Sequence, residues 1–514
     1  MSDTTGSVAL RYHTRTNHSA QRVEENVYRM DRNNRPLPYK IYASLEPLVL
    51  PNSFVSSTMS ALDAIASSTV SSSEEHIPDR EMLARLCFFA NGVTKRFHLA
   101  SGQEHALRAA ACTGALFHIE LYVVCGDVPG LAAGVYHFDV HDTSFRQLRA
   151  GDFRQVLVEA TGNEPSIAEA PAIIICTSTF WRNAYKYQAR AYRHAFWDNG
   201  TILANFLAES TSLRMPAKII LGFVDKQVNQ LLDITVQQEA AISLIALGHT
   251  NERRPTESSP ITPLHLPTVR LSAREHLFPL IHTIHMASSL PSRNEVAAWL
   301  SLPAQRMLEA STQPLLPLIP LAPAQLPEDA IEDVIQRRGS TRRFTREALS
   351  FEQLSTLLTR VMHGIPADCM EPVERPINDL YLIVNAVDGL ETGTYVLHRE
   401  QQALELLKKG DMRETAFHLA LDQDLGGDAA VNIYFLADLE PVLAQFGDRG
   451  YRVAQMEASI LAGKLYLAAY ALRLGATGLT FFDDEVTAFF SPHSAVKSVM
   501  FLIALGKPFK KSQQ

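Results

Sequence analysis

Short apolar runs rich in β-branched residues recur along both halves of the chain. Ile119 to Cys125 and Ile173 to Thr177 are such runs in the first half, and Leu380 to Asn385 and Val431 to Leu436 follow in the second. Runs of this length and composition predict buried strands. Each half ends in one more apolar run closed by a glycine, SLIALG or MFLIALG, which predicts its last strand.

A long buried helix is predicted in the second half, over Glu457 to Leu474 (EASILAGKLYLAAYALRL). Apolar residues cover nearly every face of this segment, and its small alanines permit another element to approach closely. Each half therefore combines strands and helices without regular alternation of the two. This pattern predicts an α+β sandwich.

The chain contains one segment twice. Tyr122 returns as Tyr381, and Leu213-Arg214 returns as Leu472-Arg473, each 259 residues later. The same register carries Gly130-Leu131 to Gly389-Leu390, Tyr136 to Tyr395 and Ala191-Tyr192-Arg193 to Gly450-Tyr451-Arg452. Near the end one residue is dropped, so that Phe223-Val224-Asp225 matches Phe481-Phe482-Asp483. Convergent composition would not preserve this spacing, so we expect two copies of one fold packed as an intramolecular pseudo-dimer.

Residues 250–328 are expected to connect the two copies. The segments ERRPTESSPITPLHLP and STQPLLPLIPLAPAQLP are rich in proline, which interrupts helices and central strands. A helix is expected within the connector, around Ser272 to Ser289. The predicted units are therefore a first domain over 1–249, this connector, and a second domain over 329–514.

Composition and charge exclude several classes of protein. With 514 residues, 46% hydrophobic and 20% charged, the chain can form more than one core. A formal charge of −8 disfavours nucleic acid as a partner. No apolar stretch is long enough for a membrane span, and no signal peptide is recognised, so a cytoplasmic protein is expected. The five cysteines contain no CxxC pair, and His282 and His285 lack partners at ligand spacing, so no metal site is expected.

A cluster of arginines follows the first predicted helix of the second copy. Arg337, Arg338, Ser340 and Arg342 fall within six residues and form a donor set suited to a phosphate. This RRxSxR pattern, together with the end of the copy, resembles the FMN-binding entry of the nitroreductase superfamily. In the first copy, YHTRTNHS, NRPLPYKIY, ACTGALFHIELYVV and NAYKYQARAYRH resemble the SagB/ThcOx group of flavin dehydrogenases.

The resemblance implies an FMN site shared between the two copies. The second copy keeps the arginines, whereas Ser67 and Ser68 stand opposite Arg337 and Arg338 in the first. The first copy keeps the family's small-residue loop, whereas the second has MEPVER, Met370 to Arg375, at that place. One complete composite site is therefore expected. Its cofactor-binding residues are Arg337, Arg338, Ser340, Arg342, Cys112, Thr113, Gly114, Ala115, Leu116, Thr480, Phe481 and Lys507, the last of which is equally plausible as a solvated lysine.

Two details of the first copy bear on its chemistry. Ala111 and Cys112 replace the usual proline and serine of the loop, so weaker FMN binding is expected. Lys186-Tyr187 matches the Lys-Tyr pair of the dehydrogenating members, which implies a base and a proton donor. The alternative is a surface lysine beside a packed tyrosine. The second copy has Gln445-Phe446 at this place, and neither side chain titrates usefully.

The resemblance implies an FMN-dependent oxidoreductase that dehydrogenates a heterocycle or a peptide-derived C–H/C–N bond, as in the conversion of an azoline to an azole. One alternative is an NAD(P)H-dependent reductase of nitro, quinone or enone compounds. Another is a non-catalytic flavin-binding subunit of a modification complex. The expected partners are a small-molecule or modified-peptide substrate and other biosynthetic enzymes, and the chain is expected to be a monomer or a homodimer.

Overall fold

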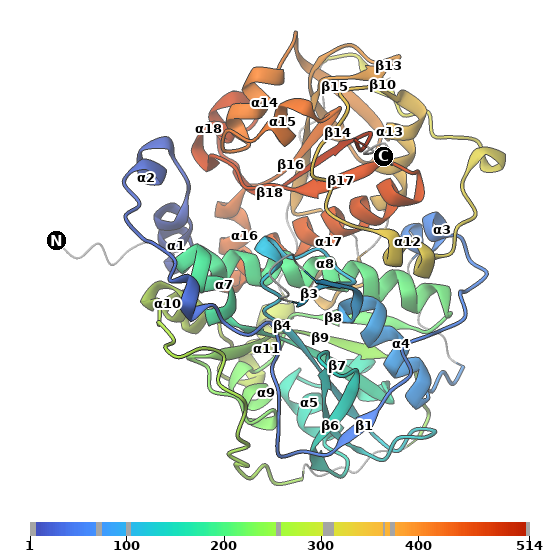
Figure 1. Cartoon of the computed structure of the whole chain (residues 1–514), viewed down its shortest axis with the longest axis vertical. Coiled ribbons are helices and arrows are strands. Elements are labelled where there is room, and N and C mark those ends of the chain that lie inside the picture. Colours follow the sequence, from blue (N-terminus) through green and yellow to red (C-terminus); the bar gives the residue numbers. More distant parts are fainter. Residues whose placement is uncertain are drawn as a thin grey trace.

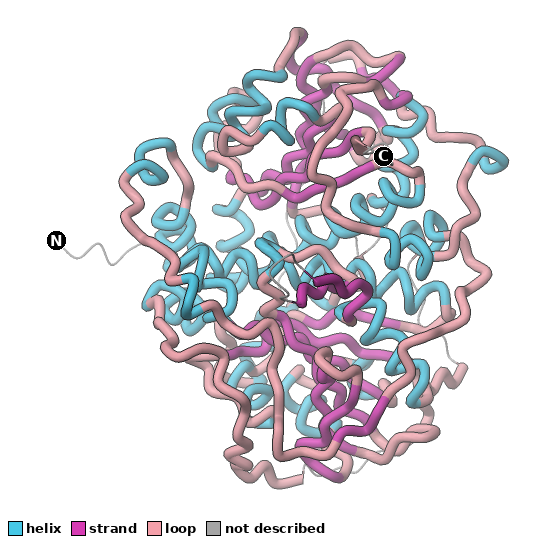
Figure 2. The backbone as a smooth tube through the Cα atoms, viewed as in Figure 1, coloured by secondary structure: helices cyan, strands magenta, loops and turns pink. Residues whose placement is uncertain are grey.

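The computed structural model describes residues 7–67, 74–98, 104–252, 259–301, 313–362, 365–370 and 376–509. Two seven-stranded sheets lie toward opposite ends of the molecule, and long helices lie between them (Figure 1, Figure 2). Each copy of the repeat forms one sheet, and the segment predicted as a connector adds the edge strand Leu315–Pro317 to the second. The structure thus confirms the predicted α+β fold with two tandem copies.

The two sheets have the same strand order, and every neighbouring pair within them is antiparallel. The first sheet is β1 (Pro47–Val49), β6 (Ser144–Ala150), β5 (Gly134–Asp139), β4 (Ile119–Cys125), β7 (Ala172–Thr179), β9 (Glu239–Leu247) and β8 (Ala217–Ile220). The second is β10 (Leu315–Pro317), β15 (Ala403–Lys409), β14 (Gly393–His398), β12 (Asn378–Val384), β16 (Val431–Ala437), β18 (Ser498–Gly506) and β17 (Gly475–Gly478). The predicted apolar runs are central strands of these sheets.

The helices also correspond between the copies. Those before and within the first copy are α1 (Val8–Thr16), α2 (Ala20–Glu24), α3 (Ala61–Ala66), α4 (Arg80–Asn91), α5 (Arg154–Ala160), α6 (Pro165–Glu169), α7 (Phe180–Tyr187), α8 (Ala191–Ser212) and α9 (Asp225–Leu231). The later ones are α10 (Pro279–Ala287), α11 (Arg293–Leu300), α12 (Ile331–Arg337), α13 (Phe351–Val361), α14 (Arg413–Leu419), α15 (Asp424–Asp428), α16 (Leu439–Phe446), α17 (Gly450–Ala471) and α18 (Asp483–Phe490). Two small pairs of strands complete the fold, β2 (Val93–His98) with β3 (Glu104–Arg108) and β11 (Leu349–Ser350) with β13 (Val387–Asp388).

The long helices α8 and α17 pack against each other between the two sheets (Figure 1). Small residues make this contact close: a Cβ on Gly463 would lie 2.6 Å from the Cβ of Ala204, and a Cβ on Gly200 would overlap the hydroxyl of Ser459. Both helices are almost wholly buried. Within the described ranges, no helix is both long enough and apolar enough to span a bilayer.

Helix α17 begins at Gly450, seven residues before the predicted start at Glu457. The added residues include polar side chains that the hydrophobic pattern assigns to the surface, such as Arg452 and Gln455. Both are buried because groups of the first copy bind them: Arg452 pairs with Asp225, and Gln455 accepts a hydrogen bond of 2.6 Å from the indole of Trp197. Tertiary contacts therefore extend the helix beyond its apolar segment.

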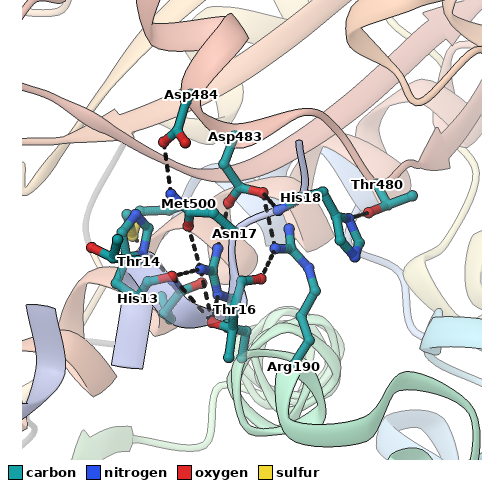
Figure 3. Close-up of polar contacts among 12 residues, drawn as sticks. His13, Thr14, Thr16, Asn17, His18, Arg190, Thr480, Asp483, Asp484 and Met500 are labelled. Atoms are coloured by element: carbon teal, nitrogen blue, oxygen red, sulfur yellow. Dashed lines mark hydrogen bonds and ion pairs between the residues drawn. The ribbon is translucent and has the colours of Figure 1, made fainter. Parts of the chain in front are cut away.

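Buried ion pairs join the copies at one side of this helix pair. Asp483 of the second copy accepts a hydrogen bond of 2.9 Å from Arg190 of the first copy (Figure 3). It accepts another, of 2.5 Å, from Arg193 of the first copy. Burial alone would raise the pKa of Asp483, but the two arginines lower it well below its usual range. The carboxylate is therefore ionised throughout the neutral range.

The same arrangement recurs with the roles of the copies exchanged. Asp225 of the first copy accepts hydrogen bonds of 2.7 Å from Arg449 and 2.7 Å from Arg452 of the second. Burial alone would raise the pKa of Asp225, but these arginines lower it to about 2. Each copy thus supplies two arginines to the other's aspartate, as expected for an isologous interface.

The segment predicted as a connector contains α10, which occupies the predicted helical region in shorter form. Arg452 donates to the carbonyl oxygen of His285 and to the hydroxyl of Ser288, at 2.9 and 2.8 Å. In the first copy, Arg193 donates in the same way to His13 and Thr16 of α1. The helix α10 is therefore the structural counterpart of α1.

The two histidines of α10 have different surroundings. His285 is buried against Tyr192 and Arg452, whereas His282 is exposed. The described part of the chain holds no group of three or more histidine, cysteine, aspartate or glutamate side chains placed to bind a metal ion.

Replacing Asp483 or Asp225 by asparagine leaves two buried arginines without their counter-charge. We expect the free energy of unfolding at neutral pH to fall by about 3–5 kcal/mol in each variant. Because the pKa of both carboxyl groups is lower in the folded protein, this stabilisation is present above the unfolded pKa of about 4 and is lost as the pH falls below it. Urea denaturation followed by tryptophan fluorescence measures the effect.

The matched control is Asp428, whose ion pair with Arg346 lies at the surface. Asp428→Asn should change the free energy of unfolding by about 1 kcal/mol or less. Equal destabilisation by all three substitutions would contradict a special role for the buried pairs.

Candidate functional site

The small-residue loop of the first copy is held in place by Asp198 of α8. The carboxylate accepts hydrogen bonds from the backbone N–H of Thr113 at 2.8 Å, from the Thr113 hydroxyl at 2.7 Å and from the Cys112 thiol at 3.0 Å. His118 contacts the second carboxylate oxygen at 2.9 Å. Burial, followed by Asp198, raises the pKa of Cys112 well above its usual range, so this thiol stays protonated.

Asp198 is a site residue that the sequence reasoning missed. The available signal was an acidic residue within a helix whose other residues are buried. A buried carboxylate requires partners, and residues of this kind gather at functional sites.

Gly114 brings the loop against Tyr187 at the end of α7. Its backbone is left-handed, with φ of 65°, and a Cβ there would lie 2.7 Å from the phenol oxygen of Tyr187. Glycine therefore allows both the turn and the contact. The loop predicted from the sequence and the predicted Lys-Tyr pair are neighbours in the structure. The contacts of Cys112, Thr113, Gly114, Ala115 and Leu116 with a cofactor stay a prediction.

Lys186 and Tyr187 differ in the direction of their pKa shifts. Lys186 is exposed, and partial desolvation, with Arg35 nearby, lowers its pKa. Desolvation by burial, with Asp198 and Cys112 nearby, raises the pKa of Tyr187 well above its usual range. The lysine ammonium lies 4.9 Å from the centre of the tyrosine ring. At neutral pH the phenol of Tyr187 therefore stays protonated and can donate a hydrogen bond. Lys186 loses its proton more readily than an ordinary lysine does.

Arg338 of the second copy reaches the first copy just before the loop. Its Nε and Nη2 donate to the carbonyl oxygens of Ala109 at 2.9 Å and Arg108 at 3.0 Å. The same guanidinium lies over the ring of Tyr466. One arginine of the predicted cluster therefore contacts the backbone of the other copy just before the loop.

The other members of the predicted arginine cluster have different surroundings. Arg337 pairs with Asp329 at 3.1 Å and donates to the carbonyl oxygen of Tyr470. The Ser340 hydroxyl is 3.4 Å from that of Tyr466, and Arg342 is exposed. Lys507 is exposed and lies 3.4 Å from Glu347. Their contacts with a phosphate stay a prediction.

Thr480 and Phe481 lie on the other side of the site, next to the N-terminal arm, the segment 7–24 that contains α1 and α2. The Thr480 hydroxyl is 3.2 Å from Nδ1 of His18 (Figure 3). Phe481 is buried and packs against Trp197, which in turn packs against His194. The ring of His194 contacts that of Tyr187, with centroids 4.6 Å apart. A continuous aromatic layer thus joins the Lys-Tyr pair to Thr480 and Phe481.

The corresponding place on the other side of the pseudo-dimer is filled by the chain itself. There the Asp368 carboxylate accepts hydrogen bonds from the backbone N–H groups of Leu221 at 2.9 Å and Gly222 at 2.7 Å. Gly222 matches Thr480 in the repeat. Trp299 donates to the carbonyl oxygen of Phe446 at 3.0 Å and packs on its ring.

The backbone also closes this second place. The segment containing Asp368 forms a bridge to β8, in which Ile219 donates to the carbonyl oxygen of Pro366 at 2.8 Å. Gln445 and Phe446 replace the Lys-Tyr pair. Ser68 and residues 371–375, which the sequence argument also used, lie outside the described residues.

Comparisons with known proteins agree with this architecture. Residues 335–507 match the model of the Nitroreductase family. A crystal structure of a protein from Anabaena variabilis, named as a nitroreductase, aligns with 98% of this chain and 100% of its own, at 27% identity and a TM-score of 0.77. The match extends over both copies.

Two curated proteins match about a third of the chain. One is MJ1384 of Methanocaldococcus jannaschii, named as a nitroreductase, which is 29% identical over 175 residues that make up 32% of this chain and 86% of that protein. The other is the trifolitoxin-processing protein TfxB of Rhizobium leguminosarum bv. trifolii, 28% identical over 177 residues, 34% of this chain and 47% of TfxB.

The fold and the family match together define a nitroreductase-like oxidoreductase built from two fused copies of one fold. The predicted resemblance to nitroreductases agrees with the family match of residues 335–507 and with the fold of the whole chain. The motifs of the first copy resemble those of SagB-type dehydrogenases, and the chain spans about half the length of TfxB.

The residues of the site fit a flavin, the cofactor typical of this family. Arg190 is 4% exposed, and its guanidinium lies 5.4 Å from the centre of the Phe481 ring. Its Nε and Nη2 have no hydrogen-bond partner among the described residues. Buried donors of this kind require an acceptor, and the carbonyl oxygens of a flavin ring are suitable ones.

We expect the purified chain to bind one flavin. Asp368 and Trp299 fill the second place, whereas the first place keeps the loop, the Lys-Tyr pair and Arg338. The ratio of released flavin, measured by its absorbance, to protein concentration tests this expectation. A ratio near two would contradict it.

Proposed function

We propose that the protein is an FMN-dependent dehydrogenase that oxidises a heterocycle or a peptide-derived C–H/C–N bond, as in the conversion of an azoline to an azole. The observation that carries the proposal is the contact between the Lys186-Tyr187 pair and the loop at Gly114. FMN, when bound, would supply the hydride acceptor. The phosphate contacts would come from the arginine cluster, and the loop would border the flavin.

Lys186 is proposed as the base that removes a proton from the substrate. Its lowered pKa increases the fraction of neutral amine near neutral pH, and the neutral Nζ can accept a proton. Tyr187 is proposed as a donor that orients a polar group of the substrate, because its raised pKa keeps the phenol protonated. The placement of Tyr187 depends on Gly114 and His194, which contact it from two sides.

The similarity to a trifolitoxin-processing protein supports a role in the modification of a biosynthetic product. The proposal therefore includes partner enzymes that prepare the heterocycle before it is oxidised.

A second candidate function is the reduction of a nitro, quinone or enone compound by NAD(P)H. It is favoured by the relatives that are named as nitroreductases. Anaerobic mixing of the flavin-loaded protein with NADPH, or with a synthetic thiazoline amide, separates the two. Rapid bleaching of the flavin absorbance by the thiazoline and not by NADPH supports the dehydrogenase, and the reverse result supports the reductase.

Lys186→Ala should slow anaerobic flavin reduction by the thiazoline amide about 10²–10⁴-fold, the usual contribution of a positioned base. Flavin affinity should be unchanged. In the wild-type protein the rate should rise with pH through the lowered pKa of Lys186, because only the neutral amine accepts a proton, and the variant should lose this dependence. Gln445→Ala, at the matching place in the second copy, is the control. A wild-type rate and pH profile in Lys186→Ala would refute the assignment.

Arg342→Ala should weaken FMN binding about 10- to 100-fold, because it removes a charge-assisted contact to the phosphate. Fluorescence titration of the apoprotein with FMN measures the dissociation constant. Arg346→Ala is the matched control, because Arg346 is also exposed and pairs with Asp428. Equal affinities of the two variants for FMN would exclude Arg342 from the phosphate site.

A further inference from the structure

A cavity of about 240 Å³ lies beside the N-terminal part of α7. Its walls come from α7, from the turn that precedes β9, and from the segment that leads into α10. The apolar lining includes Phe180, Trp181, Ala184, Leu277, Phe278 and Ile281. The polar side chains that line it are Gln237, Gln238, Glu275, His276 and His282.

The cavity and the proposed catalytic pair share one helix. Phe180, Ala184 and Tyr187 are spaced by four and three residues, so they lie along the same face of α7. The rise of a helix places Tyr187 about 4.5 Å along the axis from Ala184. This distance lies between the lengths of one and two residues of an extended peptide, at about 3.3 Å per residue.

The size of the cavity suits one large side chain. A cavity of about 150 Å³ lined by apolar groups binds benzene, whereas whole drug-sized ligands occupy about 300–1,000 Å³. The indole N–H of Trp181 is already bonded to Ser272 at 2.8 Å, so the ring offers an apolar surface to the cavity. Leu277 lines the cavity although its own side chain is 65% exposed, which indicates an apolar entrance.

The polar border supplies an acceptor for a peptide backbone. Glu275 is half-buried, and the side-chain amide of Gln238 donates to it at 3.4 Å. Within the described part of the chain, the other carboxylate oxygen of Glu275, Oε1, has no hydrogen-bond partner. A carboxylate at the edge of an apolar cavity can accept a hydrogen bond from a backbone N–H group while the side chain enters the cavity.

We infer that this cavity is a substrate subsite that binds an aromatic or branched aliphatic side chain of a peptide, one or two residues from the position that is oxidised. The inference rests on the proposed function, because it takes Lys186 and Tyr187 as the reacting centre. It assigns substrate selection to α7 and to the segment 275–282, and it leaves flavin binding to other elements.

The test uses the flavin-loaded protein and N-acetyl-L-phenylalaninamide as the probe, with N-acetyl-L-glutaminamide for comparison. Ligand-observed NMR measures both dissociation constants. The aromatic probe should bind in the millimolar range, as its size allows, and about tenfold more tightly than the glutamine compound. Leu277→Asp at the entrance and Ala184→Phe inside the cavity should each weaken binding of the aromatic probe about tenfold or more.

Met286→Asp is the matched control, because Met286 is exposed on α10 and does not line the cavity. It should leave the affinity for the probe unchanged. Leu277→Asp keeps the test decisive even where Ala184→Phe does not fold, because Leu277 is at the surface. Wild-type affinity in Leu277→Asp, or equal binding of the two probes, would overturn the inference.

The experiments distinguish failure of the subsite from failure of the proposed function. A protein that binds the aromatic probe selectively, yet whose flavin is reduced by NADPH and not by a thiazoline amide, keeps the subsite and loses the dehydrogenase assignment. A protein whose flavin is reduced by the thiazoline amide but that binds both probes equally keeps the dehydrogenase and loses the subsite.

Discussion

The reciprocal pairs between arginines and aspartates hold the two copies in one fixed arrangement. Asp225 and Asp483 are buried, and each is neutralised by two arginines from the opposite copy. A buried ion pair contributes little net stability over a packed apolar contact, but breaking one leaves an uncompensated charge. The pairs therefore penalise any displacement of one copy relative to the other. The proposed composite site depends on this constraint, because its residues come from both copies.

The symmetry of the scaffold contrasts with the asymmetry of its two sites. At one place Asp198 and Arg338 hold the loop of the first copy beside Tyr187. At the other, Asp368 bonds to the backbone amides of Leu221 and Gly222, and Trp299 packs against Phe446. Fusion of two copies into one chain lets each place change separately, whereas a homodimer must change both together. The second place has become part of the structural interior.

Two arms explain how one chain reproduces a dimer interface. One is the N-terminal segment 7–24 with α1, and the other is the segment 279–290 with α10. The arm with α1 lies against the second copy, where His18 donates its backbone N–H to Asp483 at 2.8 Å. The arm with α10 lies against the first copy, where Leu290 donates in the same way to Asp225 at 2.9 Å. Each arm therefore completes the ion pairs of the interface. The first arm also places His18 beside Thr480, so the interface and the functional site share residues.

The sequence by itself determined the repeat, the central strands and the resemblance to the nitroreductase family, whereas the division of the site between the copies stays a prediction. These features are local patterns or spacings: apolar runs such as Ile119–Cys125, the 259-residue register and the cluster around Arg338. Only the tertiary structure decided which residues hold the site, because Asp198, Arg190 and Asp368 act through partners distant in the chain. It also decided that α17 begins at Gly450 and that α10 matches α1. Both features depend on buried polar side chains, which leave no apolar pattern in the sequence and are stabilised only by partners distant in the chain.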